Sequence, residues 1–309
     1  MTHASPFYAG VELGGTKCIC VLGTGPEDIR EQIFVPTGDD PNLALTQMES
    51  AFRTWHAEYG AVSALGIASF GPVDLNKQSP TYGYITSTPK PGWSNTNVAE
   101  RLLKVYRDLG LTSLPLGFDT DVNGAALAER RWGAARGLDN FAYITVGTGV
   151  GVGLVVANRT VGGLSHPEGG HIRIARMAGD TWPGSCPFHG DCVEGLVSGT
   201  AIRARTALEG EGLVWESVAH GLAQLVHTLA VTTSPQRVLI GGGVMAAHPH
   251  LFPLIRAKLA QSLNGYLQAH ELTGGLDNYI VPPGLGTQSG PLGTLALARD
   301  AFILQSQHK

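Results

Sequence analysis

The sequence contains little charge and no strongly basic segment. Only 15% of its 309 residues are charged, the formal net charge is -4, and Lys and Arg form no long run. Proteins that bind nucleic acid or an anionic membrane usually carry such a run. No apolar stretch reaches the roughly 18 to 20 residues that cross a bilayer, and the first six residues lack the basic and apolar regions of a signal peptide. The composition therefore predicts a soluble, cytoplasmic protein whose partners include neither nucleic acid nor a membrane.

Cysteine is also scarce, because the chain has only four. So few cysteines in a chain of this length fit a reducing compartment better than a disulfide framework. Cys18 and Cys20 alternate along a β-rich run, and we expect them to pack in the core.

Apolar residues make up 43% of the chain, enough to bury a large core, and the length suggests two packed lobes. Residues 7–22 and 141–156 share one pattern: a β-rich run, a tight glycine turn and a second β-rich run. The two hairpins lie nearly half the chain apart. This repetition predicts a duplicated α/β lobe with a cleft between the halves.

Helical and extended patterns alternate through the rest of the chain, which favours α/β lobes over an all-β or bundle fold. The periodicity predicts helices at about 41–59, 95–109, 122–135, 213–232, 251–269 and 290–304, and strands at 64–70, 114–118 and 237–240. Residues 158–195 break the alternation and are rich in Gly, Pro, His and Cys. Such a segment is typical of a loop that a metal ion orders.

Four residues in that loop have the types and spacing of zinc ligands: His171, Cys186, His189 and Cys192. Zinc accepts four Cys or His ligands in a tetrahedron, and three of these residues follow one another at intervals of three. A disulfide between Cys186 and Cys192 is the alternative, but it leaves both histidines unexplained. Glu168 and Glu194 flank the cluster, so one metal could hold two carboxylates against a polyhydroxy substrate.

Three glycine clusters could approach a phosphate group: Gly14-Gly15-Thr16-Lys17, Gly147-Thr148-Gly149 and Gly241-Gly242-Gly243. Glycine lets backbone N-H groups reach an anion, and a threonine hydroxyl can donate a further hydrogen bond. Each cluster by itself could equally serve only to turn the chain. No Gly-x-x-x-x-Gly-Lys-Ser/Thr pattern occurs, so the Walker type of nucleotide site is absent.

Asp121 is the candidate for a catalytic base. The run Asp119-Thr120-Asp121 follows a predicted strand and precedes a predicted helix, so it lies at the strand end where open α/β sheets bind ligands. The alternative is that Asp119 or Asp121 only caps the helix.

Taken together, these motifs resemble the ROK family of bacterial sugar kinases, and within it the fructokinase-like branch. The resemblance covers nearly the whole chain. Its carriers are Glu12 to Lys17, Gly66 to Pro72, Thr88 to Trp93, Asp119 to Glu129, the second glycine hairpin, Pro167 to His171, and Cys186 to Gly199.

The resemblance implies a two-lobed, actin-like ATPase fold of the ribonuclease H-like type, with a duplicated α/β core and a zinc-bound loop. The first lobe would comprise residues 1–118 with a returning helix at about 290–309, and the second residues 119–289 with the zinc loop at about 158–195. The resemblance also implies a homodimer.

The implied reaction moves the γ-phosphoryl group of ATP, with Mg²⁺, to a hexose hydroxyl. Asp121 would take the proton from that hydroxyl, and the glycine clusters would hold the nucleotide. Zn²⁺ would be structural, and His171 would serve both metal and sugar. The residues that the resemblance places at the sugar are Glu168, His171, Glu194, Gly71 and Thr120.

Three positions depart from the commoner family pattern. His189 replaces a cysteine, as in the fructokinase-like branch, and Glu12 replaces an aspartate near the phosphates. Thr120 replaces an asparagine that helps to hold glucose, which makes glucose the less favoured substrate.

The leading hypothesis is a fructokinase that acts on the 6-hydroxyl, with mannose or another hexose as the rival substrate. From other classes come a zinc-bearing interaction module and a sugar-sensing transcription regulator. We expect no regulator, because the first strand begins near Phe7 and leaves no room for a helix-turn-helix.

Overall fold

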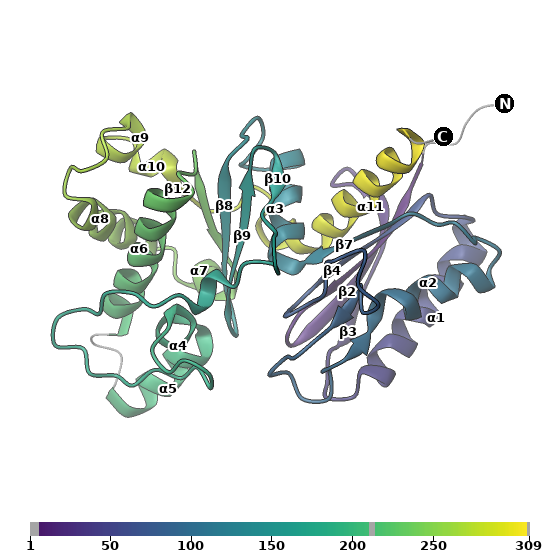
Figure 1. The fold of residues 1–309 in the computed structure, drawn as a ribbon, viewed down its shortest axis with the longest axis horizontal. Coiled ribbons are helices and arrows are strands. Elements are labelled where there is room, and N and C mark those ends of the chain that lie inside the picture. Colours follow the sequence, from purple (N-terminus) through teal and green to yellow (C-terminus); the bar gives the residue numbers. More distant parts are fainter. Residues whose placement is uncertain (1–5, 210–213, 308–309) are drawn as a thin grey trace. The chain divides into compact units, whose positions relative to one another are not determined.

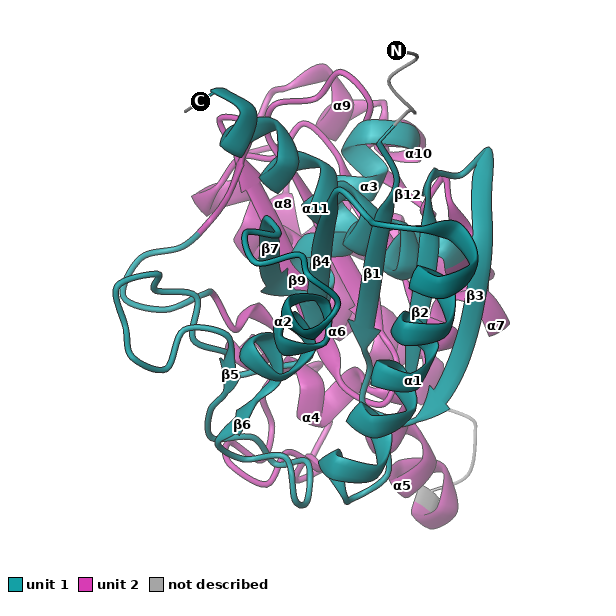
Figure 2. Cartoon of the chain, turned by 90° about the vertical axis from the view of Figure 1, so that its right-hand side faces the viewer, with its two compact units in different colours: residues 1–132, 162–166, 288–309 teal, residues 133–161, 167–287 magenta. Residues whose placement is uncertain are grey.

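The computed structural model describes residues 6–209 and 214–307, and Figure 1 shows their helices and strands. The chain forms two compact units, which Figure 2 distinguishes by colour. Unit 1 comprises residues 1–132, 162–166 and 288–309, and unit 2 comprises residues 133–161 and 167–287.

Unit 1 is built on a five-stranded sheet with the strand order β3-β2-β1-β4-β7. The strands β1, β2 and β3 are antiparallel, whereas β4 and β7 run parallel to β1. Its strands are β1 (Tyr8–Leu13), β2 (Lys17–Gly25), β3 (Asp28–Pro36), β4 (Ala64–Ser69) and β7 (Leu116–Thr120), beside the short pair β5 (Tyr84–Ile85) and β6 (Thr96–Asn97).

Two pairs of helices cover the two faces of this sheet. The helices α1 (Pro41–Tyr59) and α2 (Val98–Asp108) pack on the apolar face, where Cys18 and Cys20 are buried as expected. The helices α3 (Asp121–Trp132) and α11 (Ser289–Gln307) pack on the other face. A Cβ atom at Gly66 would lie 1.8 Å from the backbone oxygen of Thr294, so only glycine lets α11 lie this close to the strands.

The helix α3 also crosses α11 at close range, since a Cβ atom at Gly293 would lie 2.3 Å from the backbone carbon of Gly124. This packing places α3 in unit 1, so the unit extends to Trp132 and not only to the expected residue 118.

Unit 2 repeats the arrangement with the strand order β10-β9-β8-β11-β12. As in unit 1, an antiparallel hairpin, β8 and β9, is followed by a strand, β11, that pairs in parallel with the hairpin's first strand. The duplication predicted from the two glycine hairpins is therefore confirmed. The strands are β8 (Phe141–Val146), β9 (Val150–Val156), β10 (Arg159–Thr160), β11 (Val238–Gly241) and β12 (Ile280–Val281).

The helices of unit 2 pack mainly through α6 and α8, whose buried apolar residues complete the core of the sheet. They are α4 (Val193–Val197), α5 (Gly199–Glu209), α6 (Val214–Thr232), α7 (Gly243–Ala247), α8 (Leu251–Leu263), α9 (His270–Thr273) and α10 (Leu276–Tyr279). The part of the chain that the structure describes also contains the 3₁₀ turns η1 (Gly169–His171), in this unit, and η2 (Gly286–Gln288), at its border.

Every helix and strand that the sequence predicts is present, with shifts at the ends. The helix predicted to run to residue 269 ends at Leu263, because Asn264 adopts a left-handed conformation with φ of 45°. The predicted start of α6 at residue 213 lies outside the described residues. Within residues 6–209 and 214–307, no helix combines the length and apolarity that a membrane crossing requires.

Candidate functional site

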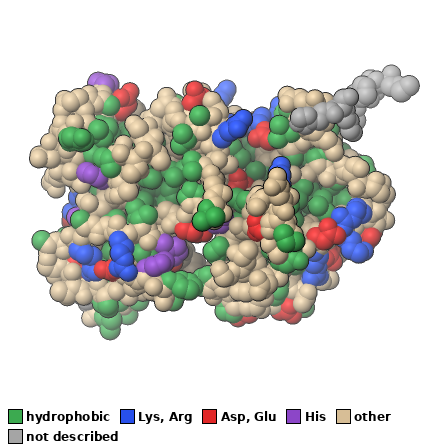
Figure 3. All heavy atoms as spheres, viewed as in Figure 1, with side chains coloured by type: hydrophobic (Ala, Val, Ile, Leu, Met, Phe, Trp, Pro, Cys, Tyr) green, Lys and Arg blue, Asp and Glu red, His purple; other side chains and the backbone are tan. Residues whose placement is uncertain are grey.

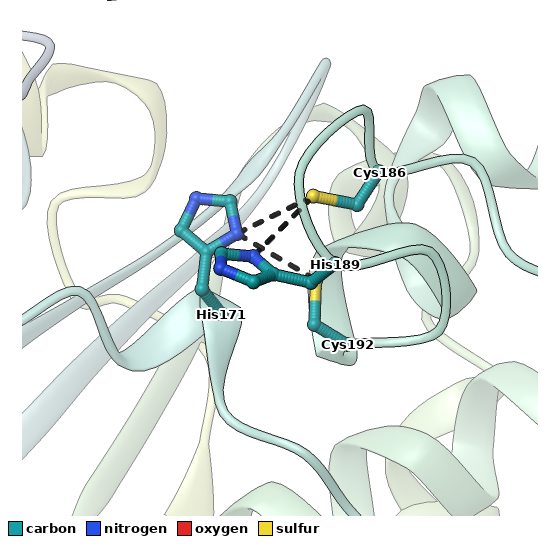
Figure 4. A group of neighbouring side chains, drawn as sticks. All are labelled: His171, Cys186, His189 and Cys192. Carbon is teal, nitrogen blue, oxygen red and sulfur yellow. Dashed lines mark hydrogen bonds between the residues drawn. The ribbon is translucent and has the colours of Figure 1, made fainter. Parts of the chain in front are cut away.

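The four predicted metal ligands lie together in unit 2. One nitrogen or sulfur atom from each of His171, Cys186, His189 and Cys192 lies within 4.8 Å of the other three. Figure 4 shows that the rings and thiols point toward one another. His171 ends the turn η1, whereas the other three residues come from the segment that leads into α4.

The distances fit a tetrahedral metal ion. The Nδ1 atom of His171 lies 3.7 Å from the Sγ atom of Cys186 and 3.5 Å from that of Cys192, and Nδ1 of His189 lies 3.7 Å from Cys186 Sγ. Tetrahedral zinc with ordinary bond lengths separates a nitrogen and a sulfur ligand by about 3.5 Å. Cys186 and Cys192 are free thiols, so the structure does not contain the alternative disulfide.

A tight turn presents the ligands. The backbone nitrogens of Cys186 and Gly190 donate to each other's carbonyl oxygens at 3.2 and 3.0 Å, and Gly190 has a positive φ of 63°. A residue with a side chain would be strained at this φ. The turn therefore holds Cys186 and His189 at close range.

Ion pairs fix the same loop at two further points. Asp191, next to Cys192, accepts from Arg173 at 2.6 Å and from Arg176 at 3.1 Å. Asp180 is paired with the buried Arg205 of α5 through two hydrogen bonds of 3.0 Å. These pairs were not predicted, because their partners lie 15 to 25 residues apart along the chain.

Burial opposes ionisation of Asp180, but its hydrogen bonds and the charges of Arg205 and Arg176 outweigh burial and hold its pKa below the ordinary value. The carboxylate is therefore charged where it pairs with Arg205. This pair anchors the loop to the helical part of unit 2.

The three predicted sugar residues of unit 2 form a group beside the metal cluster. With Nδ1 of His171 turned to the thiols, its Nε2 lies 4.0 Å from Oε1 of Glu194. Burial raises the pKa of Glu168, an electrostatic interaction with His171 opposes the rise, and the nearby Glu194 carboxylate raises it further. A partly dehydrated group of two carboxylates and an imidazole is suited to hydrogen bonds with hydroxyl groups.

Glu194 also connects this group to the second glycine turn. Its Oε2 atom accepts from the backbone nitrogen of Val150 at 3.0 Å, and a Cβ atom at Gly149 would lie 2.5 Å from the same oxygen. Any larger residue at position 149 would displace the carboxylate. The turn thus has a role in placing Glu194 that the sequence analysis did not anticipate.

The two glycine clusters of unit 2 are neighbours. A Cβ atom at Gly242, whose φ is 91°, would lie 2.4 Å from the backbone oxygen of Val146, directly before Gly147-Thr148-Gly149. The nitrogen of Gly199 donates to the Gly147 oxygen at 2.7 Å. Thr148 and Gly243 are exposed, so backbone groups of both clusters are accessible to a ligand.

The first glycine turn joins β1 to β2 in unit 1. The nitrogen of Gly14 donates to the Lys17 oxygen at 3.1 Å, and the Thr37 hydroxyl donates to the Gly14 oxygen at 2.6 Å. Gly15, Thr16 and Lys17 are exposed. The ammonium group of Lys17 lies 5.0 Å from the centre of the Phe34 ring, within the range of a cation–π interaction.

Asp121 is the first residue of α3, at the end of β7. The Thr120 hydroxyl accepts from the backbone nitrogen of Asn123 at 3.2 Å, and Oδ1 of Asp121 accepts from that of Val122 at 2.9 Å, so Thr120 and Asp121 both bond N-H groups of the first turn. Buried Asp119 instead accepts from the backbone of Thr120 at 2.8 Å and from the Asn123 amide at 2.7 Å. Thr120, predicted to contact sugar, thus also fixes the helix start that carries Asp121.

Glu12 lies beside Asp121 in unit 1. Burial raises the pKa of the Glu12 carboxyl to about 7, the charge of Asp121 raises it, and Lys17 opposes the rise. Oε1 of Glu12 lies against the start of α11, since a Cβ atom at Gly290 would lie 2.0 Å from it. The sequence showed that Glu12 departs from the family pattern, but only the fold shows its proximity to Asp121.

Gly71, the remaining predicted sugar residue, follows β4 and precedes Pro72 through a cis peptide bond. The preceding residue, Phe70, donates from its nitrogen to the Leu13 oxygen at 2.9 Å. Gly71 therefore lies at the same sheet edge as the first glycine turn, in unit 1.

The surface agrees with the low charge of the sequence. On the face drawn in Figure 3, basic and acidic side chains of the described residues are interspersed and do not form a patch of one sign.

Two units with the same strand order, each with a glycine turn in its first hairpin, define the class of actin-like ATPase folds. The structure is similar to that of a ROK hexokinase from Thermus thermophilus, with a TM-score of 0.74, 24% identity, and coverage of 98% of this chain and 100% of that chain. The predicted fold class is therefore confirmed.

The chain belongs to the ROK family, whose model matches residues 8–301. It is 40% identical over 297 residues to a fructokinase of Pediococcus pentosaceus, with 94% of this chain and 97% of that protein covered. It is 39% identical over 307 residues to a fructokinase of Zymomonas mobilis subsp. mobilis, with 96% of this chain and 98% of that protein covered.

Proposed function

We propose that this protein is an ATP-dependent fructokinase that transfers the γ-phosphoryl group of ATP to the 6-hydroxyl of fructose. The observation that carries the proposal is the likeness to fructokinases at 39% and 40% identity over at least 94% of the chain. The geometry supports it, because unit 2 gathers two carboxylates and an imidazole suited to a polyhydroxy ligand, and both units present accessible glycine turns.

Each residue has a distinct task in this proposal. Asp121 of unit 1 accepts the proton of the attacking hydroxyl. Glu168, His171 and Glu194 hold the sugar hydroxyls, so a sugar without the matching hydroxyl would leave buried polar groups unpaired. Gly71 and Thr120 contact the sugar from unit 1.

The exposed backbone groups of the three glycine clusters hold the phosphates and ribose of ATP. Mg²⁺, bound with the nucleotide, would offset the negative charge of the phosphates. The charge of Asp121 raises the pKa of Glu12, so the two carboxylates interact, and together they would attract that ion.

Zn²⁺ is the proposed metal of the His171, Cys186, His189 and Cys192 cluster. Two thiols and two imidazoles are typical zinc ligands, and because all four positions come from protein, the ion would be structural. It would stabilise the loop that carries His171 and leads into Glu194.

We further propose that the protein is cytoplasmic and forms a homodimer. Sedimentation of the purified chain would test the oligomeric state.

Mannose or another hexose is the rival substrate. A coupled assay of ADP release, run with fructose, mannose, glucose and their 6-deoxy analogues, would distinguish these candidate substrates. We expect the highest kcat/KM with fructose and no turnover with 6-deoxyfructose. Activity on glucose alone would contradict the proposed specificity, and sugar binding without turnover of any hexose would favour a sugar sensor.

A further inference from the structure

His166 is the last residue of a short segment of unit 1 that interrupts unit 2 along the chain. Residues 162–166 belong to unit 1, although the segments on both sides, 133–161 and 167–287, belong to unit 2. The His166 side chain is buried, with 5% of the residue exposed, and its Nε2 accepts from the backbone nitrogen of Val73 at 3.0 Å. This hydrogen bond anchors the end of the short segment to unit 1.

The acceptor role determines the protonation of the ring. Because Nε2 receives the Val73 N-H, Nε2 carries no proton, and the ring proton of neutral His166 is on Nδ1. A leucine at this position would fill a similar volume but could not accept, and would leave the buried Val73 N-H without its partner.

Both ends of the hydrogen bond are two residues from a proposed sugar contact. Val73 follows Gly71, and Glu168 follows His166. The Val73 segment is itself fixed, because Val73 forms a β-bridge with Ile85 and the carbonyl of Pro72 accepts from the Thr86 nitrogen at 2.8 Å. A displacement of His166 would therefore be transmitted along a short length of backbone to Glu168.

We infer that His166 is a positioning residue for the sugar: its hydrogen bond to Val73 fixes the backbone two residues before Glu168. The inference rests on the proposed hexose kinase function. It assigns His166 no contact with the sugar and no part in ATP binding.

The test compares His166→Leu with His166→Gln, whose amide oxygen can still accept from Val73. His227→Leu is the matched control, since His227 is another partly buried histidine with a hydrogen bond, at 2.9 Å to Ser262, that joins α6 to α8. KM for fructose, KM for ATP and kcat are measured for each, with thermal unfolding as the check of folding.

We expect His166→Leu to raise KM for fructose about tenfold, which is the size expected from losing one buried hydrogen bond, while KM for ATP changes less than about twofold. His166→Gln should recover most of the fructose affinity, and His227→Leu should leave both KM values near those of the wild type. Unchanged fructose kinetics in His166→Leu, or an equal rise of both KM values, would overturn the inference.

Amide hydrogen exchange provides a readout that does not depend on turnover. In His166→Leu the Val73 amide should exchange about tenfold faster than in the wild type, whereas His227→Leu should leave it unchanged. Unchanged exchange at Val73 would overturn the inference even in an active kinase. If the wild type acted on no hexose, the proposed function would be overturned instead. The rate of amide exchange at Val73 would still show whether the hydrogen bond to His166 protects it.

Discussion

The Oε2 atom of Glu194 lies 3.0 Å from the backbone nitrogen of Val150 and accepts its hydrogen bond. Glu194 is in the first turn of α4, directly after the metal loop, and Val150 directly follows the second glycine turn. One carboxylate therefore links the loop that the metal orders to a turn proposed to bind phosphate. Its other oxygen, 4.0 Å from His171 Nε2, remains directed at the proposed sugar residues.

This arrangement separates two contributions of Glu194. Glu194→Gln keeps an oxygen for Val150 but removes the charge, whereas Glu194→Ala removes both. We expect KM for fructose to rise about tenfold in the Gln variant and more in the Ala variant, because the latter also leaves the Val150 N-H unpaired. Steady-state kinetics of both variants would check this, and equal kinetics for the two would contradict the structural link.

Removing the proposed base should stop turnover without unfolding the protein. We expect Asp121→Asn to lower kcat by a factor of about 100 to 10,000, the usual contribution of a general base, with an unchanged melting temperature. Asp108→Asn, at an exposed aspartate paired with Lys104 and Arg53, is the control and should keep wild-type kcat. Substantial turnover in Asp121→Asn would remove Asp121 from its proposed role.

Glu12 should make stability depend on pH. Its pKa is about 7 in the folded protein against 4.5 for the free group, so folding favours its protonated form. The associated stabilisation is present below about pH 4.5 and is lost as pH rises through about 7. We expect Glu12→Gln to increase the free energy of unfolding by about 1 to 3 kcal/mol at pH 8, and by much less at pH 5.

Urea unfolding at both pH values, without nucleotide or Mg²⁺, would measure this difference. A Gln variant less stable than the wild type at pH 8 would show that the Glu12 carboxylate is well accommodated when charged.

Metal content gives an independent check of the zinc proposal. We expect about one zinc per chain, and Cys186→Ser should lower both the zinc content and the affinity for fructose, because the loop loses a ligand that orders His171. Cys20→Ala, at a buried cysteine of unit 1, is the control and should keep its zinc. Full fructose affinity in metal-free protein would argue against a link between the loop and the sugar.

The buried ion pair of unit 2 should matter far more than an exposed one. Arg205→Met leaves Asp180 as a buried carboxylate without its main partner, so we expect a loss of about 3 kcal/mol in the free energy of unfolding. Arg53→Met breaks an exposed pair with Asp108 and should cost much less, because solvent screens that pair. Denaturant unfolding of both variants would compare the two losses.

Local patterns in the sequence were sufficient for much of the fold. Apolar periodicity predicted the long helices, and the glycine turns within β-rich runs predicted the paired hairpins of the two units. The helices α4, α5, α7, α9 and α10 and the strands β3, β5, β6, β10 and β12 were not predicted. Most of these have only two to five residues, and such elements depend on tertiary contacts more than on their own periodicity.

By itself the sequence determined the candidate metal ligands and the glycine turns, since these signals consist of residue types at short, fixed spacing. Only the tertiary structure decided that Thr120 bonds the first turn of α3 together with Asp121, that Glu12 lies beside Asp121, that Glu194 bonds Val150, and that His166 bonds Val73. Each of these relationships depends on atoms in space. Three of them join residues far apart along the chain, so no local pattern of residues could contain them.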